Sequence, residues 1–176
     1  MAALKRAPTL MVIAWLMPGD GALRKQLVDL LTGGNAHASF EATVEKFPVD
    51  RAGERVSGWP HSAWELLEHL RIAQEDILRF AGGPSHGYVE LKWPDEYWPG
   101  SATPANTGDW DRSVAAFHTD LQKFLAMIQD SNNLLDAPFA WGTGQTLLRQ
   151  ALLLADHNAY HVGQLMLIRR ALEASH

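Results

Sequence analysis

The sequence of 176 residues contains no cysteine. A chain without thiols cannot form a disulfide scaffold, a thiolate metal site or a cysteine nucleophile. A metal ion in this protein must therefore be held by histidine, aspartate, glutamate or water. A reaction that needs a thiol must take that thiol from another molecule.

Basic residues are also in the minority. The chain has 15 Lys and Arg against 20 Asp and Glu, which gives a formal net charge of −5 at pH 7. This balance argues against nucleic acid or an anionic membrane surface as the main partner. We therefore expect no nucleic-acid partner and no membrane partner.

Long hydrophobic runs are scarce as well. Residues 10–17 form an apolar run behind Lys5 and Arg6, but the run is too short to span a bilayer. Two interpretations of residues 1–17 stay open: a secretory-signal-like segment with a poor cleavage site, or an over-extended gene start with Met17 as the initiator. We favour a cytoplasmic protein in which residues 1–19 are an N-terminal extension and residues 20–173 form one domain.

Four parts of the chain carry a helical pattern of apolar residues, and two of them have clear start signals. Asp20 is placed to cap the first, and Ser62 with Glu65 forms a capping box at the start of the second. No stretch alternates as a strand does. The pattern indicates an all-α four-helix bundle. The predicted helical segments are 21–33 with a continuation over 36–47, then 62–81, 109–129 and 144–171.

Residues 84–108, between the second and third predicted helices, lack helical period. This segment contains four prolines, which forbid a long helix, and four large aromatic residues, which favour burial. A loop of this length in a compact domain is unusual. We expect it to pack across one end of the bundle, where it either lines a pocket or closes the end of the bundle.

Three histidines suit one metal site. His157 and His161 are four residues apart, so they lie one turn apart on the same side of a helix. His69 lies at the margin of the apolar stripe of the 62–81 helix. Neutral imidazoles bind Zn, Ni, Cu or Fe, and three of them leave a position open for water or substrate. From spacing alone, the alternative that carbonyls or water satisfy these imidazoles stays open.

A metalloprotease of the His-Glu-x-x-His kind is excluded by one residue. In that motif a glutamate beside the first histidine acts as the general base. Here the position is Asn158, which cannot take up a proton. Asp156, on the other side of His157, points to a different face of the helix. The remaining histidines have no partner at ligand spacing, so we expect local or surface roles for His37, His61, His86, His118 and His176.

Three segments together resemble the DinB family, in the DinB/YfiT-like superfamily. They are HSAWELLEHLRIAQEDIL (61–78), LKWPDEYWP (91–99) and GQTLLRQALLLADHNAYHVGQL (144–165). The resemblance implies a four-helix bundle with a divalent metal, nickel or zinc, bound by one histidine of the second helix and two of the fourth. These ligands correspond to His69, His157 and His161. It also implies a homodimer, and relatives that are S-transferases dependent on bacillithiol or mycothiol, or a mycothiol-dependent maleylpyruvate isomerase.

A metal at these three histidines suggests a function. Its open position would bind a low-molecular-weight thiol and lower the pKa of that thiol, or would activate a water. The first gives a thiol-dependent S-transferase and the second a hydrolase, each acting on a small molecule. The alternative is a non-catalytic metal- or ligand-binding stress-response protein. Glu65 and Asp76 are candidates to support His69, and Gln164 could orient a ligand, although ordinary polar roles stay open for all three.

Overall fold

The chain folds into helices joined by loops. The computed structural model describes residues 19–34 and 36–174, so residues 1–17, with their two interpretations, lie outside the described part. Within that part no strand forms, and an isolated bridge joins Pro138 to Thr146. The all-α prediction is confirmed. The helices are α1 (Gly21–Thr32), α2 (Phe40–Val44), α3 (Ala63–Gly82), α4 (Asp109–Gln129) and α5 (Leu147–Ala174), with short 3-10 turns η1 (Val49–Arg51), η2 (Pro84–His86) and η3 (Asp95–Tyr97).

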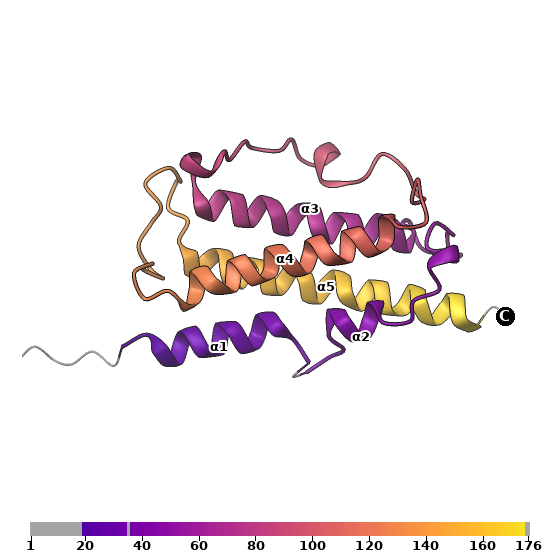
Figure 1. Ribbon diagram of the computed structural model, residues 1–176, viewed down its shortest axis with the longest axis horizontal. Helices are drawn as coiled ribbons and strands as arrows, with labels where there is room; N and C mark the ends of the chain where they lie inside the picture. Colours follow the sequence, from indigo (N-terminus) through magenta and orange to yellow (C-terminus); the bar gives the residue numbers. More distant parts are fainter. Residues whose placement is uncertain (1–18, 35, 175–176) are drawn as a thin grey trace, which may run out of the picture.

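The four longer helices, α1, α3, α4 and α5, form a bundle (Figure 1). Hydrogen bonds join α3 to α4 in a parallel register. The Ser113 hydroxyl donates to Glu68, and further along both helices Gln74 Nε2 donates to the Phe117 carbonyl at 2.6 Å. Helix α5 runs the opposite way, packs against α3 and α1, and lies diagonally across the bundle from α4. Because α3 and α4 are consecutive and parallel, the chain between them must return along the length of the bundle, and simple up-down topology is excluded.

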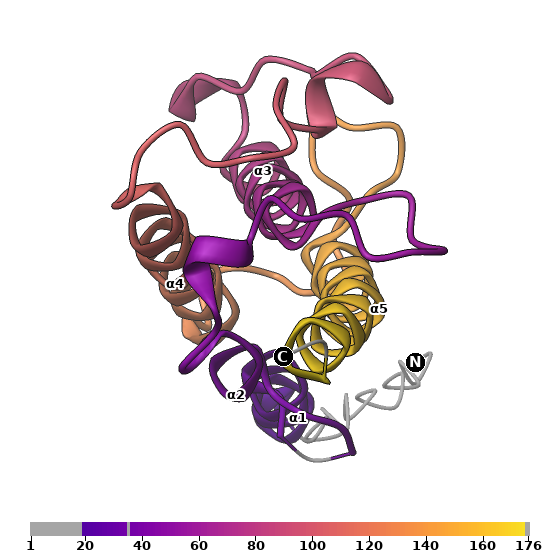
Figure 2. The ribbon, with the colours of Figure 1, turned by 90° about the vertical axis from the view of Figure 1, so that its right-hand side faces the viewer.

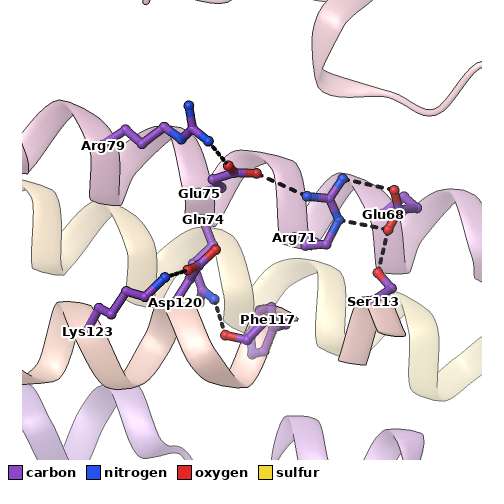
Figure 3. Close-up of polar contacts among 9 residues, drawn as sticks. All are labelled: Glu68, Arg71, Gln74, Glu75, Arg79, Ser113, Phe117, Asp120 and Lys123. Atoms are coloured by element: carbon purple, nitrogen blue, oxygen red, sulfur yellow. Dashed lines mark hydrogen bonds and ion pairs between the residues drawn. The ribbon is translucent and has the colours of Figure 1, made fainter. Parts of the chain in front are cut away.

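The α3–α4 side carries a set of polar contacts (Figure 3). Arg71 binds Glu68 at 2.9 Å and Glu75 at 3.0 Å along α3, while the buried Gln74 amide reaches across to α4. An unpaired amide in a core costs roughly 1–3 kcal/mol. The Gln74 contact therefore favours one rotation of α3 about its axis, and this rotation decides which side of α3 carries His69.

The hydrophobic core lies between α3, α4 and α5. It follows from helical spacing, since apolar residues three and four apart share a helix face. Their side chains are fully buried and interlock across the three helices, and α1 adds Leu27 and Leu31 from below. The largest buried side chains of the three helices include Leu66, Leu67, Leu70, Phe117, Phe124, Ile128, Leu154, Leu165 and Ile168.

The helix boundaries follow local hydrogen bonds and glycine geometry. Gly33 and Gly34 have φ of 74° and 80°, a region that favours glycine, and they end the first helix as predicted. The continuation is shorter than the predicted 36–47, because the Ser39 side chain accepts from the Ala42 N–H and starts α2 only at Phe40. Likewise Thr146 Oγ1 accepts from the Arg149 N–H, so α5 begins three residues later than predicted.

The two predicted cap signals had different outcomes. Ser62 and Glu65 form the full capping box, with the serine side chain accepting from the Glu65 N–H and the glutamate accepting from the Ser62 N–H. Asp20 precedes α1 but makes no cap hydrogen bond. Its carboxylate instead binds the Arg24 side chain at 2.6 and 2.8 Å. Asp20 therefore occupies the predicted N-cap position, but its side chain does not cap the helix, because a guanidinium one turn along the helix competes for the same oxygens.

The α3–α4 loop runs along the outer side of α3 and does not cap one end of the bundle (Figure 2). Tyr97, in η3, reaches His69 and Asp76 in the middle of α3. The end-capping prediction was therefore wrong. The parallel direction of α3 and α4 is the reason, because the loop must cover the whole length of α3 to reach the start of α4. None of the described helices is both long and apolar enough to cross a membrane.

Arg24 fastens α1 to the far end of α4. Its buried guanidinium donates to the carbonyls of Ile128, Asp130 and Asn133, the last at 2.7 Å. These carbonyls lie at and just beyond the C-terminus of α4, where the helix leaves acceptors without intrahelical partners.

We predict that Arg24→Ala lowers the free energy of unfolding by about 2–3 kcal/mol, because one buried and two part-buried carbonyls lose their donor at once. Lys25→Ala is a matched control, since Lys25 is exposed and its partner among the described residues is the surface residue Asp29. This variant should change stability by less than about 0.5 kcal/mol. Urea denaturation followed by circular dichroism measures both. Equal loss in the two variants would contradict the role assigned to Arg24.

Candidate metal centre

His69, His157 and His161 converge at the interface of α3 and α5. One ring nitrogen from each of the three lies within 4.8 Å of the others, and the Nε2 atoms of His69 and His157 are 3.1 Å apart. His69 is almost fully buried, while the two α5 histidines are half-buried. The three imidazoles that the sequence singled out therefore lie together. They make up the one His/Asp/Glu group with ligand spacing among the described residues.

Hydrogen bonds fix the tautomers of two of these rings. His69 Nδ1 lies 2.8 Å from the carbonyl oxygen of Tyr97, which can only accept, so this nitrogen carries the proton. His161 Nδ1 lies 2.7 Å from Gln164 Oε1 and donates in the same way. In a neutral imidazole the other nitrogen then has a free lone pair. The Nε2 atoms of both rings are thus available as ligands.

The third ring, His157, lacks such a partner. Its Nδ1 is buried and makes no hydrogen bond among the described residues. His69 Nε2 has no proton, so it can accept a hydrogen bond from His157 Nε2, 3.1 Å away, when His157 Nε2 is protonated. In that tautomer His157 Nδ1 has no proton and is left as an unpaired acceptor. Asn158 Oδ1, on the next residue, is the other buried side-chain atom without a partner in the described chain.

Burial lowers the pKa of all three imidazoles. Desolvation is the main cause in each case, and it lowers the pKa of His157 and of His161 from 6.5 to about 4. The neighbouring imidazoles lower the pKa of His157 further, while its contact with Asn158 opposes the shift. Burial also lowers the pKa of His69, against the bond to Tyr97. At neutral pH the rings are therefore uncharged, the state in which imidazole binds a metal ion.

Aromatic rings of the loop hold His69 from the other side. The Trp98 ring stacks on His69 with centroids 4.0 Å apart and an interplanar angle of 3°. The opposite face of Trp98 stacks on His61, also at 4.0 Å. His69 is thus held by a backbone carbonyl at one edge and by a ring across its face. Its ring plane is set by the loop as well as by α3.

A cavity of about 240 Å³ opens beside the three histidines. Its walls include Asp76 of α3, Trp93 and Tyr97 of the loop and Leu153 of α5. The Tyr97 hydroxyl donates to Asp76 Oδ2 at 2.8 Å, and burial raises the pKa of the Asp76 carboxyl while this hydrogen bond opposes the rise. Loop, helix and imidazoles therefore meet at one cavity, and the prediction that the aromatic loop could line a pocket is confirmed.

The predicted supporting residues had mixed outcomes. Gln164 binds His161 and orients it, as the one-turn spacing suggested. Asp76 reaches His69 only through Tyr97, whose hydroxyl and carbonyl bind the two residues. The prediction for Glu65 was wrong, because its carboxylate is taken up by the capping box and by Arg55 at 2.8 Å. Helical spacing predicts which residues lie on one side of a helix, but it does not predict which other groups form hydrogen bonds with them.

The side chain of Asn158 is not among those that line the cavity. Its Nδ2 donates to Gln74 Oε1 at 3.2 Å, inside the bundle. This direction agrees with the exclusion of a metalloprotease, since the side chain at that position faces the core and not the cavity. Of the other histidines, His37 is exposed with Nδ1 near the Ala38 carbonyl, and His118 lies 3.6 Å from Glu41.

Two contacts of the site were missed by sequence reasoning. The Tyr97 carbonyl is a backbone group, so residue type gives no sign of its role. His61 was assigned a local role, yet it belongs to the His61–Trp98–His69 stack. A usable signal was present in the tryptophan-rich loop, because large aromatic rings in a loop need a surface to cover.

The three imidazoles fit a divalent transition-metal ion. Ligand nitrogens around tetrahedral zinc lie about 3.3 Å from one another, near the 3.1 Å between two of these atoms. Binding through His157 Nε2 requires its proton on Nδ1. This tautomer makes the unpaired His157 Nδ1 a donor, and the side chain of Asn158, whose unpaired Oδ1 is an acceptor, acts on this ring. A set of nitrogen ligands alone suits Zn, Ni, Cu or Fe.

We predict that the metal-free protein loses stability as the pH falls from about 6.5 toward about 4. The folded pKa values of His157 and His161 lie below 6.5, so the unfolded chain binds more protons in this window and acid favours unfolding. A His157→Gln, His161→Gln double variant should show a flatter fall, and His37→Gln should match the wild type. Urea midpoints at pH 7, 5.5 and 4.5 measure the slopes, and parallel slopes in all three proteins would refute the prediction.

The comparisons with known proteins give one match. Residues 35–165, about three quarters of the chain, match a family model described as the DinB superfamily. Comparison with curated proteins and with solved structures found no match. The matched region contains α2, α3, α4, the loop and the part of α5 that carries both histidines. By the match over most of its length, the chain belongs to the DinB superfamily.

Proposed function

We propose that this protein is a divalent-metal-dependent enzyme that acts on a small molecule at the three-histidine centre. The observation that carries the proposal is a set of three neutral imidazoles, with no fourth protein ligand among the described residues, beside a cavity of about 240 Å³. Metal sites that serve stability alone are usually closed by four protein ligands, whereas catalytic sites keep a position for water or substrate. His69, His157 and His161 are the proposed ligands, and nickel or zinc is the proposed metal.

A metal ion at this site supplies Lewis acidity, which lowers the pKa of a thiol or water that enters the cavity. The residues of the chain prepare that step. Tyr97 and Gln164 hold two imidazoles in the tautomer that presents Nε2. Trp93 of the loop and Leu153 of α5 add apolar surface to the walls of the cavity. Asp76, half-buried in the same cavity, is the carboxylate placed to accept a proton or a positive charge.

Thiol-dependent S-transfer is the first reaction class to test, and hydrolysis is the second. The absence of cysteine means that a transferred sulfur must come from a low-molecular-weight thiol. The competing proposal is a non-catalytic metal- or ligand-binding stress-response protein. The open position favours catalysis over that role, because a ligand that only stabilises the bundle gains from full protein coordination.

We predict that the purified protein binds about one equivalent of Zn²⁺ or Ni²⁺, and that His69→Ala and His157→Ala abolish this binding. Gln164→Leu should weaken metal affinity by about 10–100-fold, because the hydrogen bond that holds His161 in its ligand tautomer is lost. Gln122→Leu, an exposed glutamine on α4, is the matched control. Elemental analysis and competition with a chromophoric chelator give the stoichiometry and affinity. Unchanged metal content in both histidine variants would refute the site.

An activity screen separates the proposed classes. The metal-loaded protein is assayed with low-molecular-weight thiols plus electrophiles, and separately with activated esters and amides. Turnover that requires a thiol and disappears in His157→Ala supports the transferase, and turnover in water alone supports the hydrolase. Metal binding without turnover in either assay would favour the non-catalytic protein.

A homodimer, a cytoplasmic location and a single domain over residues 20–173 stay predictions. One observation supports the dimer: Leu152, Tyr160 and Leu167 are exposed at two-turn spacing along one side of α5. A second copy packed on this side would bury them. Light scattering that gives the mass of a monomer at micromolar concentration would exclude the dimer.

A further inference from the structure

The walls of the cavity beside the histidines are unevenly charged. The lining side chains are apolar, aromatic or imidazole, apart from the carboxylate of Asp76, and no lysine or arginine is among them. Of the basic residues nearest along the chain, Lys92 is exposed and Arg79 binds Glu75 at 2.5 Å. An anionic ligand would therefore meet a carboxylate in the cavity without a basic side chain to offset it.

Asp76 has no basic partner among the described residues. Its one hydrogen bond there comes from the Tyr97 hydroxyl, and the charged groups that act on it are the carboxylates of Glu75 and Glu90. A half-buried carboxylate is costly to desolvate unless a cation or several donors compensate it. A positively charged group in the cavity would provide this compensation.

The aromatic walls also favour a cation. Trp93 lines the cavity, yet 72% of its surface is exposed, and it packs edge-on against Tyr97 with centroids 5.3 Å apart. An ammonium group over a tryptophan face is attracted by the ring quadrupole. A carboxylate beside aromatic rings is thus a combination suited to an organic cation, with the apolar part of the ligand against Ala73, Ile77 and Leu153.

We infer that the cavity selects a small molecule with a protonated amine, whose ammonium group lies between the Asp76 carboxylate and the Trp93 ring while its reacting end faces the three histidines. This inference names the substrate class of the proposed enzyme and rests on that proposed function. Asp76 is then a residue that determines specificity. The charge of the ligand would also explain why this carboxylate, beside the three histidines, has no basic partner among the described residues.

Three thiols that differ in charge test the inference on the full-length protein. Cysteamine is a cation, 2-mercaptoethanol is neutral and mercaptoacetate is an anion, and each offers one sulfur. Their dissociation constants are measured with the Co²⁺-substituted protein from the thiolate-to-cobalt absorption band. Because the intrinsic acidities of the thiols differ, the quantity compared is the ratio of the 2-mercaptoethanol constant to the cysteamine constant, in the wild type and in each variant.

We expect Asp76→Asn to lower this ratio by about fivefold and to strengthen mercaptoacetate binding by a similar factor, with the affinity for 2-mercaptoethanol changed by less than about twofold. Trp93→Leu should lower the ratio by about two- to threefold. Glu90→Gln is the matched control, since it removes the same charge from a residue outside the cavity wall, and should leave the ratio within about twofold.

The possible results separate this inference from the proposed function. A ratio unchanged in Asp76→Asn, or lowered equally in Glu90→Gln, overturns the inference alone. Equal weakening of all three thiols in Asp76→Asn also overturns it, because the carboxylate would then act on the thiol proton and not on the ligand charge. A wild-type protein that binds no cobalt, or whose cobalt spectrum responds to no thiol, overturns the proposed open metal site and the inference with it.

Discussion

The hydrogen bond from His69 Nδ1 to the Tyr97 carbonyl is the contact on which the site depends. It places the proton of His69 on the nitrogen that faces the loop, so the lone pair of Nε2 faces the other two imidazoles. The same contact ties the α3–α4 loop to the middle of α3. Because the Tyr97 hydroxyl also binds Asp76, one residue of the loop orients a proposed metal ligand and holds the carboxylate of the cavity.

The direction of the helices explains why the loop is available for this role. Parallel α3 and α4 require a connection that runs the length of α3 (Figure 1). That connection brings Trp98 onto the face of His69 and Trp93 and Tyr97 onto the cavity. A short turn between antiparallel helices would have left the outer side of α3 open to water. The long loop therefore contributes to the site more than to the core, which the α-helices form between them.

Burial keeps the three imidazoles in the neutral form that can bind a metal ion, because it lowers their affinity for protons. Desolvation lowers the pKa of each ring, so neutral lone pairs are present at physiological pH without a nearby base. Two buried polar atoms, His157 Nδ1 and Asn158 Oδ1, have no hydrogen-bond partner among the described residues, and this lowers the stability of the fold. Both belong to the arrangement that a metal ion would complete, which is the physical reason to regard the cluster as more than a set of packed core histidines.

The sequence by itself indicated the helices, the capping box at Ser62 and the His157–His161 pair, because each depends on spacing along one helix or on residues a few positions apart. The sequence also identified Gln164, one turn from His161, for the same reason. His69, on another helix, was added to this pair by its position on that helix and by the resemblance to the DinB family, and the structure brings the three rings together. Only the tertiary structure decided that Glu65 serves the capping box and Arg55, that Tyr97 and Trp98 hold His69, and that Asp76 shares the cavity with the imidazoles. These contacts join residues distant in the chain, some through backbone atoms, and their geometry follows from how α3, the loop and α5 pack together.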